Sequence, residues 1–326
     1  MIDSCHRTID YIRISLTDRC NLRCVYCMPE EGVAALSHDQ ILTYEEILRL
    51  CRCFAKLGIH KVKLTGGEPL VRKDVPYLIK QLKQIEGIDN ITLTTNGILL
   101  KAQMEALAGA GIDGVNISLD TLDPQQFFRI TRYECLDRVL EGLEEALRYP
   151  QVNVKINCVP MEGEVRKDTV IRMAGMARDR NLPVRFIELM PIGLGKELHG
   201  YTEEALKMIL SEAYGPLQHF EKPLGNGPCV YYTIDGFQGQ IGFISAISHK
   251  FCDQCNRIRL TADGSLKNCL QFAGGVNLKK IMEQGITDAD LVELIRETIL
   301  KKPQGHEFGK KESDDREERN MSQIGG

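Results

Sequence analysis

Three cysteines within a short stretch are the residues best suited to do chemistry. The stretch "DRCNLRCVYCMP" holds Cys20, Cys24 and Cys27. Closed structural zinc sites have four ligands, so a zinc ion would need a fourth, such as His6 or His38. Three thiolates can instead hold a cluster of four irons and leave one iron open to a small molecule. The C-x3-C-x2-C spacing favours the cluster, because zinc knuckles usually pair their cysteines as C-x2–4-C twice.

A second group, "CDQCNRIRLTADGSLKNC", holds Cys252, Cys255 and Cys269. Taken alone, this group also fits a zinc ribbon that lacks one ligand. Arg257 and Arg259 are two residues apart, so an extended segment points both guanidinium groups to one side. Such a pair binds phosphate or carbonyl oxygens, although it also occurs on solvated strand faces. The neighbouring arginines favour an iron–sulfur cluster beside a site for an anionic ligand.

The stretch "TGGEP" places Gly66, Gly67 and an acid at the end of a predicted strand. Two glycines let a ligand approach the backbone closely. By itself the stretch is equally typical of a plain turn. Together with "CNLRCVYC", in which Tyr26 precedes the last cysteine, it resembles the signature of radical S-adenosylmethionine (SAM) enzymes. The resemblance implies that the open iron of a 4Fe–4S cluster binds SAM, whose cleavage yields a 5′-deoxyadenosyl radical that removes a substrate hydrogen.

Nearly the whole chain is similar to the branch of this family that cyclises GTP in molybdenum cofactor biosynthesis. The similarity includes "LTTNG", "NISLDTLD", "RFIELMPIG", the second cysteine group and the final "IGG". It implies two 4Fe–4S clusters, with the guanine of GTP on the second, and removal of the ribose 3′ hydrogen followed by attack on C8. It also implies an external one-electron donor and a downstream cyclic pyranopterin monophosphate synthase as partners.

The resemblance carries particular roles onto particular residues. The implied SAM contacts are Tyr26, Gly67, Ser118 and Met190. The implied GTP contacts are Arg13, Lys63, Thr94, Lys155, Arg257, Ile258 and Arg259. Catalytic roles are implied for Arg257, Arg259 and the terminal Gly325 and Gly326, which reach into the active site in this family.

The residue pattern supports the implied anion site independently. Arg13, Lys63 and Lys155 lie on predicted strands between apolar residues, where a cation is costly unless it lines a polar cavity. Lys63 stands where the family leads us to expect arginine, so its charge is kept but the bidentate fork is lost. His6 stands where we expect glycine.

Six strand-like segments, each followed by a helical pattern, must position these residues. They cover residues 10–15, 61–67, 90–96, 114–120, 152–159 and 183–189. This alternation predicts an α/β fold built as a partial (β/α)6 TIM-type barrel, with the active site at the carboxyl ends of the strands. Residues 1–199 form the predicted barrel, residues 200–302 a smaller α+β domain covering its open side, and residues 303–326 a flexible tail that ends in two glycines.

The composition narrows the class of protein. The chain has 326 residues, 43% hydrophobic residues and a net charge of −4, which gives no global basic field for nucleic acid. It contains no apolar run of about 18 residues, so we expect no membrane span. Its start lacks an apolar signal region, which predicts a cytoplasmic protein. In a reducing compartment the clustered cysteines favour metal ligation over disulfides. The remaining cysteines are expected to be buried or surface residues without a role: Cys5, Cys51, Cys53, Cys135, Cys158 and Cys229.

Two other functions remain open at this stage. One is another radical SAM enzyme with an auxiliary cluster, such as a peptide-modifying maturase. The other is a non-catalytic iron–sulfur or zinc scaffold, against which "GGEP" and Tyr26 argue, because a scaffold needs no SAM pocket. The oligomeric state is also open, with a homodimer as one alternative.

Overall fold

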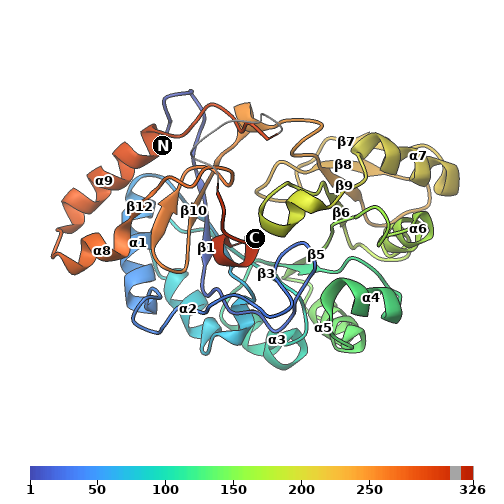
Figure 1. The fold of residues 1–326 in the computed structure, drawn as a ribbon, viewed down its shortest axis with the longest axis horizontal. Helices are drawn as coiled ribbons and strands as arrows, with labels where there is room; N and C mark the ends of the chain where they lie inside the picture. Colours follow the sequence, from blue (N-terminus) through green and yellow to red (C-terminus); the bar gives the residue numbers. More distant parts are fainter. Residues whose placement is uncertain (309–316, 326) are drawn as a thin grey trace.

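Six parallel strands form the centre of the fold, in chain order along one sheet (Figure 1). The computed structural model describes residues 1–308 and 317–325. The strands are β1 (Tyr11–Ser15), β2 (Lys61–Thr65), β3 (Asn90–Thr95), β4 (Gly114–Ser118), β5 (Asn153–Cys158) and β6 (Val184–Ile187). All six lie within the predicted segments, because each is a short β-branched run that ends at a polar or glycine-rich turn.

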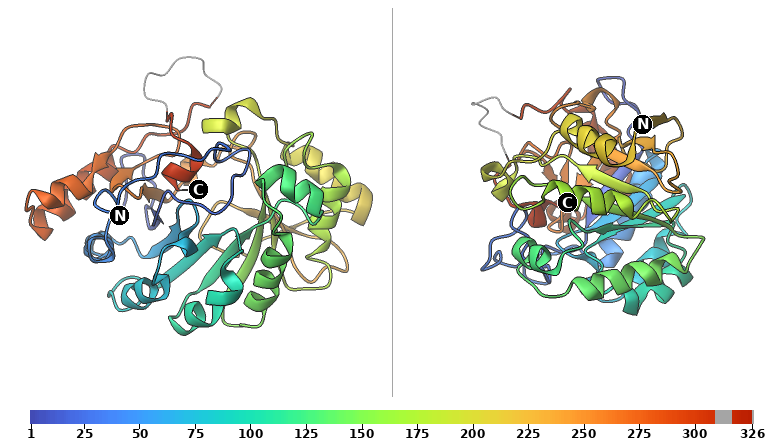
Figure 2. Two further views of the ribbon diagram at one scale, coloured as in Figure 1. Left: turned by 60° about the horizontal axis from the view of Figure 1, so that its bottom comes forward. Right: turned by 90° about the vertical axis from the view of Figure 1, so that its right-hand side faces the viewer.

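Helices connect these strands and lie around the outer side of the curved sheet (Figures 1 and 2). They are α1 (Tyr44–Lys56), α2 (Val75–Leu82), α3 (Leu100–Gly109), α4 (Pro124–Thr131), α5 (Leu136–Leu147) and α6 (Lys167–Gly175). The predicted start of α1 is confirmed, since the Thr43 side chain and Glu46 form a capping box. Cys51 lies on its buried face, as predicted.

The chain after residue 200 adds strands to both edges of the same sheet. Next to β6 the order is β9 (Ile241–Ile244), β8 (Val230–Thr233) and β7 (Gln218–Phe220); next to β1 it is β10 (Arg257–Leu260), β11 (Ser265–Lys267) and β12 (Val276–Asn277). The helices of this part are α7 (Glu203–Tyr214), α8 (Leu278–Glu283), α9 (Asp288–Leu300) and α10 (Met321–Ile324).

The predicted α/β class with an open parallel sheet is confirmed. β9 and β10 pair in parallel with β6 and β1. The next strands outward, β8 and β11, are antiparallel to β9 and β10, and β7 and β12 at the edges are in turn antiparallel to β8 and β11. Strands from before and after residue 200 belong to one sheet. The division into domains at that residue therefore stays a prediction.

Strand alternation sorts the side chains of the sheet onto two faces. Ile12 and Ile14 of β1 and Val62 and Leu64 of β2 belong to the large core shared with the helices. Arg13, between the two isoleucines, faces the opposite, inner side of the sheet. The inner side therefore receives the polar and charged residues of the strands.

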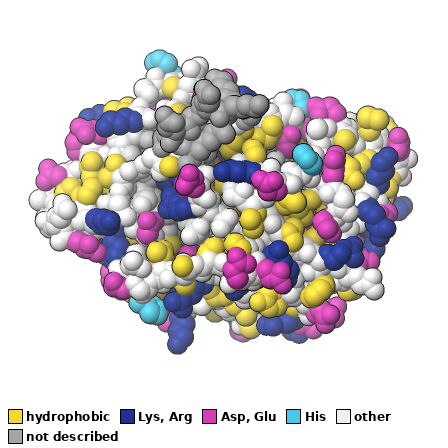
Figure 3. All heavy atoms as spheres, in the orientation of Figure 1, with side chains coloured by type: hydrophobic (Ala, Val, Ile, Leu, Met, Phe, Trp, Pro, Cys, Tyr) yellow, Lys and Arg dark blue, Asp and Glu magenta, His cyan; other side chains and the backbone are white. Residues whose placement is uncertain are grey.

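The outer surface in the view of Figure 3 carries interspersed acidic and basic side chains. None of the helices in the described ranges is long and apolar enough to cross a membrane.

Candidate active site

The first cysteine group lies in the loop that follows β1. The amides of Cys27 and Met28 both donate to the carbonyl oxygen of Cys24, at 2.9 and 3.0 Å, which folds the three cysteines into a tight turn. The amide of Leu22 donates to Sγ of Cys20 at 3.4 Å. Amide hydrogen bonds to sulfur favour thiolate ligands of iron–sulfur clusters.

The "GGEP" segment packs against this loop. A Cβ at Gly67 would lie 2.4 Å from the carbonyl oxygen of Arg19, and one at Gly66 would lie 2.6 Å from that of Thr17. Only glycine therefore allows the two segments to approach this closely. The amide of Gly67 donates to the Thr17 carbonyl at 2.6 Å. The sequence singled out both glycines, and the structure gives them a packing reason.

Glu68 of the same segment is buried and ties two strand ends to the cysteines. Its carboxylate accepts from the Thr95 hydroxyl and the Asn96 amide, both at 2.7 Å. Burial raises the pKa of Glu68 to about 7. The Asn96 side chain in turn donates to Sγ of Cys20 at 3.9 Å. One network thus connects the ends of β2 and β3 to the first cysteine group.

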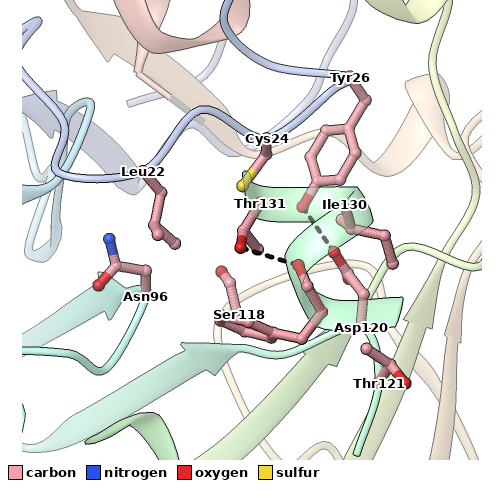
Figure 4. A pocket seen from close by; sticks show the side chains of 10 residues that line it. Leu22, Cys24, Tyr26, Asn96, Ser118, Asp120, Thr121, Ile130 and Thr131 are labelled. Carbon is pink, nitrogen blue, oxygen red and sulfur yellow. Dashed lines mark hydrogen bonds between the residues drawn. The ribbon is translucent and has the colours of Figure 1, made fainter. Parts of the chain in front are cut away.

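A small, partly open cavity lies beside Cys24 (Figure 4). Tyr26 and Ser118, two of the implied SAM contacts, both line it. The Tyr26 hydroxyl donates to Asp120 at 2.9 Å, and burial raises the pKa of Asp120 to about 6. The structure therefore brings these two residues together at the first cysteine group.

The other two implied SAM contacts lie elsewhere around the same loop. Gly67 lies against Arg19, on the "GGEP" side. Met190 packs with Ile192, Leu270 and Ile324 in a small apolar cluster separate from the main core. Of the four implied SAM contacts, Tyr26 and Ser118 line the cavity of Figure 4, and Gly67 packs against the cysteine loop.

The second cysteine group flanks β10 at its amino end. The amide of Cys255 donates to the Cys252 carbonyl at 3.1 Å, and the amide of His306 donates to Sγ of Cys252 at 3.4 Å. Burial alone would raise the pKa of Cys255, but the charges of Arg257 and Lys302 outweigh it and lower the pKa to about 6. The second group therefore lies in a positive field that favours thiolates.

Arg7 holds the second group from the chain start. Its guanidinium donates to the carbonyl oxygens of Cys252 at 3.0 Å and Gln304 at 2.9 Å, and it forms a buried ion pair with Asp3 at 2.7 Å. His6, just before it, has a φ of 61°. Glycine adopts this left-handed conformation most easily, which is a physical reason for the expectation of glycine at this position.

The surroundings of the cysteine groups are compatible with iron–sulfur clusters. Among the residues of the described ranges, no three His, Cys, Asp or Glu side chains converge to hold one metal ion. A four-iron cluster needs no such convergence, because each of three cysteines binds a different iron. The amide-to-sulfur bonds at Cys20 and Cys252 fit thiolate ligands of such clusters.

The implied GTP contacts gather on the inner face of the sheet. Arg13 is paired in register with Arg259 on one side and Lys63 on the other. Burial and the charges of Arg185, Arg13, Lys155 and Arg257 hold the pKa of Lys63 well below its ordinary value. Because the four charges named here are all positive, an anion bound at this face would be electrostatically favoured.

The remaining implied contacts differ in placement. Thr94 lies on the inner face of β3, in register with Asn116. Burial and then the charge of Arg185 lower the pKa of Lys155 to about 8. The Ile258 side chain is fully buried in the main core, so only its backbone is left for a ligand.

The tail joins the two groups. Arg259 donates from Nη1 to the Gly325 carbonyl at 2.8 Å. Gly325 has a φ of 90°, and a Cβ there would lie 2.9 Å from the Cβ of Ser15. A backbone hydrogen bond from Ser322 reaches Cys27. Gly326 lies outside the described residues.

Sequence reasoning missed Arg185, whose Nη2 donates to Asn157 at 2.5 Å while its buried Nε has no hydrogen-bond partner in the described chain. The signal was present, because "PVRFIEL" places a cation between apolar residues as β1, β2 and β5 do. Of the cysteines expected to have no role, Cys51, Cys53 and Cys158 are buried, and Cys5, Cys135 and Cys229 are partly exposed.

Comparisons with family models divide the chain in two. Residues 14–174 match the Radical SAM superfamily, and residues 182–308 match Molybdenum Cofactor Synthesis C.

Full-length relatives are similar over the whole chain. A GTP 3′,8-cyclase of Clostridium perfringens is 46% identical over 326 residues, covering 100% of both chains, and one of Syntrophomonas wolfei is 46% identical over 329 residues with the same coverage. Among solved structures, Streptococcus suis SuiB bound to S-adenosylmethionine aligns with a TM-score of 0.62 at 16% identity, covering 89% of this chain and 68% of that one. The last similarity shows the fold.

Proposed function

The chain belongs to the GTP 3′,8-cyclase family of the radical SAM superfamily, and from this premise we propose how its residues convert GTP to 3′,8-cyclo-7,8-dihydro-GTP. This is the first step of molybdenum cofactor biosynthesis in the family. Cys20, Cys24 and Cys27 would hold a 4Fe–4S cluster, which would supply the electron for cleaving SAM to the 5′-deoxyadenosyl radical that removes the ribose 3′ hydrogen.

The single observation that carries the proposal is the placement of the two cysteine groups at opposite ends of neighbouring strands. The first group follows β1, and Cys252 and Cys255 precede β10, which pairs with β1 in parallel. Four paired residues at 3.3 Å each, plus the turns, separate the two ends by roughly 15 Å. Arg13 and Arg259 lie side by side between them. One extended anionic molecule fits this span.

On the SAM side, Tyr26, Gly67, Ser118 and Met190 would hold SAM around the first group. Gly67 allows the "GGEP" segment to pack against the cysteine loop, and the Tyr26–Asp120 hydrogen bond, at 2.9 Å, keeps the aromatic ring in place at the cavity. Excluding water from this cavity protects a reactive radical from side reactions.

On the GTP side, the inner cations would bind the triphosphate, because charged donors on a buried face make strong hydrogen bonds to phosphate oxygens. The residues are Arg13, Lys63, Lys155 and Arg185, with Thr94 as a neutral donor. Arg257 and Arg259 would orient the guanine and ribose beside the second cluster, held by Cys252, Cys255 and Cys269. Gly325 and Gly326 would set the position of Arg259.

The test uses anaerobically reconstituted enzyme with SAM, reductant and GTP carrying deuterium at the ribose 3′ position. We expect about eight irons per chain and deuterium in 5′-deoxyadenosine. If 5′-deoxyadenosine forms without deuterium while the label stays in GTP, the substrate or the position is wrong. Zinc bound at Cys252, Cys255 and Cys269 would contradict the second cluster.

The wider setting is also proposed. An external one-electron donor would reduce the first cluster, and a cyclic pyranopterin monophosphate synthase would take the product. We propose a cytoplasmic location, a homodimer as one oligomeric alternative, and the division into residues 1–199, 200–302 and 303–326.

A further inference from the structure

A fully buried ion pair holds the C-terminal segment in place. Lys267 and Glu317 form it, with exposed side-chain fractions of 0% and 3%. Lysine and glutamate are almost never buried this completely unless they are paired. Burying both charges costs desolvation free energy that a surface pair avoids. The position of the pair therefore needs an explanation.

Glu317 begins the second described range, and it is held from several sides. Its carboxylate accepts from Nε and Nη2 of Arg319, both at 3.0 Å, in addition to Lys267. Its amide donates to the Gln271 carbonyl at 2.7 Å. Both carboxylate oxygens are thus used, and the backbone is fixed at the same point.

Lys267 lies next to the arginine that meets the other end of the segment. In the antiparallel pair of β10 and β11, Lys267 stands directly opposite Arg259. Residues opposite each other point to the same face of a sheet. Arg259 donates to the Gly325 carbonyl at 2.8 Å. The residues from Glu317 to Gly325 therefore run from one cation to its cross-strand neighbour.

Between these two ends, the segment forms a short helix that packs in a small apolar cluster. It forms α10, a helix of four residues with a capping box between Asn320 and Gln323. Two of its residues, Met321 and Ile324, belong to the small apolar cluster, together with Met190, Ile192, Leu270 and Phe308. A helix this short has no stability of its own in water. Its position depends on what holds its ends.

We propose that Lys267 and Glu317 are positioning residues for the cyclisation, because their ion pair sets where Gly325 meets Arg259. Neither residue is among the proposed contacts of GTP or SAM; both act through the segment of residues 317–325. The proposal rests on the proposed function for its catalytic consequence. The anchor at Arg259 involves a proposed substrate contact, whereas neither Lys267 nor Glu317 is among the proposed contacts of GTP or SAM.

The test compares Glu317→Gln with a matched surface variant. Glu141 pairs with Lys101 at 3.2 Å and is 55% exposed, so Glu141→Gln removes the same charge without touching the segment. For each reconstituted holoenzyme, we measure irons per chain, 5′-deoxyadenosine formed and cyclised product formed. We expect Glu317→Gln to lower product per 5′-deoxyadenosine by about tenfold, with iron content unchanged and Glu141→Gln equal to wild type.

A second readout does not depend on catalysis. Hydrogen–deuterium exchange of the peptide spanning residues 317–325 should rise in Glu317→Gln and stay unchanged in Glu141→Gln. Because Glu317→Gln leaves Lys267 buried without a full charge partner, Glu317→Asp is the gentler variant. It keeps the charge and shortens the reach, so it should retain both clusters and lose coupling by a smaller factor.

The outcomes separate the alternatives. If Glu317→Gln and Glu317→Asp both match wild type in coupling, the positioning role is overturned, even when exchange rises. Unchanged exchange would show that the pair does not hold the segment. If wild-type enzyme cleaves SAM but never converts GTP, the proposed function fails, whereas the exchange experiment still decides whether the ion pair anchors the segment.

Discussion

The two cysteine groups lie in opposite electrostatic surroundings. Burial raises the pKa of Cys20 to about 11 and that of Cys27 to about 12, and at Cys20 the charge of Arg23 offsets only a small part of this effect. At the second group, Arg257 and Lys302 outweigh burial and lower the pKa of Cys255 to about 6. Two similar cysteine triads have therefore been placed in different fields.

This difference matches the charges of the two proposed ligands. SAM carries a positively charged sulfonium, and the buried Glu68 and Asp120 lie on the side of the first group. GTP carries a triphosphate, and the cations gather between the groups and around the second. Complementary fields sort charged ligands more than they add affinity. On the proposed assignment, the electrostatic field rather than the cysteine spacing distinguishes the SAM end from the GTP end.

The largest effect is expected from replacing one cysteine in each group, which separates the roles of the two groups. Cys24→Ala should abolish both SAM cleavage and GTP conversion, whereas Cys269→Ala should abolish GTP conversion and leave SAM cleavage. Quantifying 5′-deoxyadenosine and product in the same reaction separates the two. Cys5→Ala, at a partly exposed cysteine outside both groups, is the control. Persistent SAM cleavage in Cys24→Ala would remove the first group from the reaction.

The next prediction concerns Asp120, one of the two buried acids near the first cysteine group. The pKa of Asp120 is raised from 3.8 to about 6 by burial, so the folded state holds a proton that the unfolded chain releases. Stability from this group is fully present below pH 4 and is lost as the pH rises through 6, by about 3 kcal/mol in total. Asp120→Asn should remove that pH dependence in urea unfolding of the metal-free protein.

The exposed Glu141→Gln variant is the control for this measurement, and it should keep the wild-type slope of stability against pH. If Asp120→Asn keeps the wild-type slope of stability against pH, burial does not raise the pKa of Asp120 in the folded state.

A smaller effect is expected from one inner cation. Lys155→Met should raise the KM for GTP by about 10- to 100-fold, because a hydrogen bond to a charged group contributes about 1.5–3 kcal/mol. The KM for SAM should not change. Steady-state kinetics with each substrate in turn check both values, with the exposed Lys101→Met as control. Equal losses for SAM and GTP would show that the field does not sort the ligands.

The smallest effect is expected at Lys63, the position where the resemblance leads us to expect arginine. Lys63→Arg should lower the KM for GTP by about two- to fivefold, because a guanidinium binds phosphate through two donors. Isothermal titration with GTP and the reconstituted enzyme measures the same change directly. A weaker affinity in Lys63→Arg would instead show that the surrounding space is fitted to lysine.

The six central strands and the start of α1 were predictable because their signals are local. Each strand is a short β-branched run, and the capping box at Thr43 and Glu46 is four residues long. The pairing of β10 with β1 was not predictable, since no periodicity connects segments at opposite ends of the chain. That pairing is what brings Arg259 beside Arg13.

The candidate site shows the same division. Its cysteines, Gly67 and the strand cations were visible from residue type and spacing. Arg185 was overlooked although it followed the same pattern, and the ion pair of Lys267 with Glu317 has no local signal. Burial and long-range pairing decide which charged residues become part of a site, and neither is written in a short stretch of sequence.

The pairing of β1 with β10 also sets when the protein can acquire its nucleotide site during synthesis. The strands β1 to β6 can assemble in order as they leave the ribosome, because each pairs with the one before it. Asn256, at the start of β10, contacts Asp10 across 246 residues. Until that late strand docks, Arg13 has no Arg259 beside it and the barrel wall is incomplete. The row of cations proposed to bind the nucleotide is therefore complete only after the chain beyond residue 256 has been made and β10 has paired with β1.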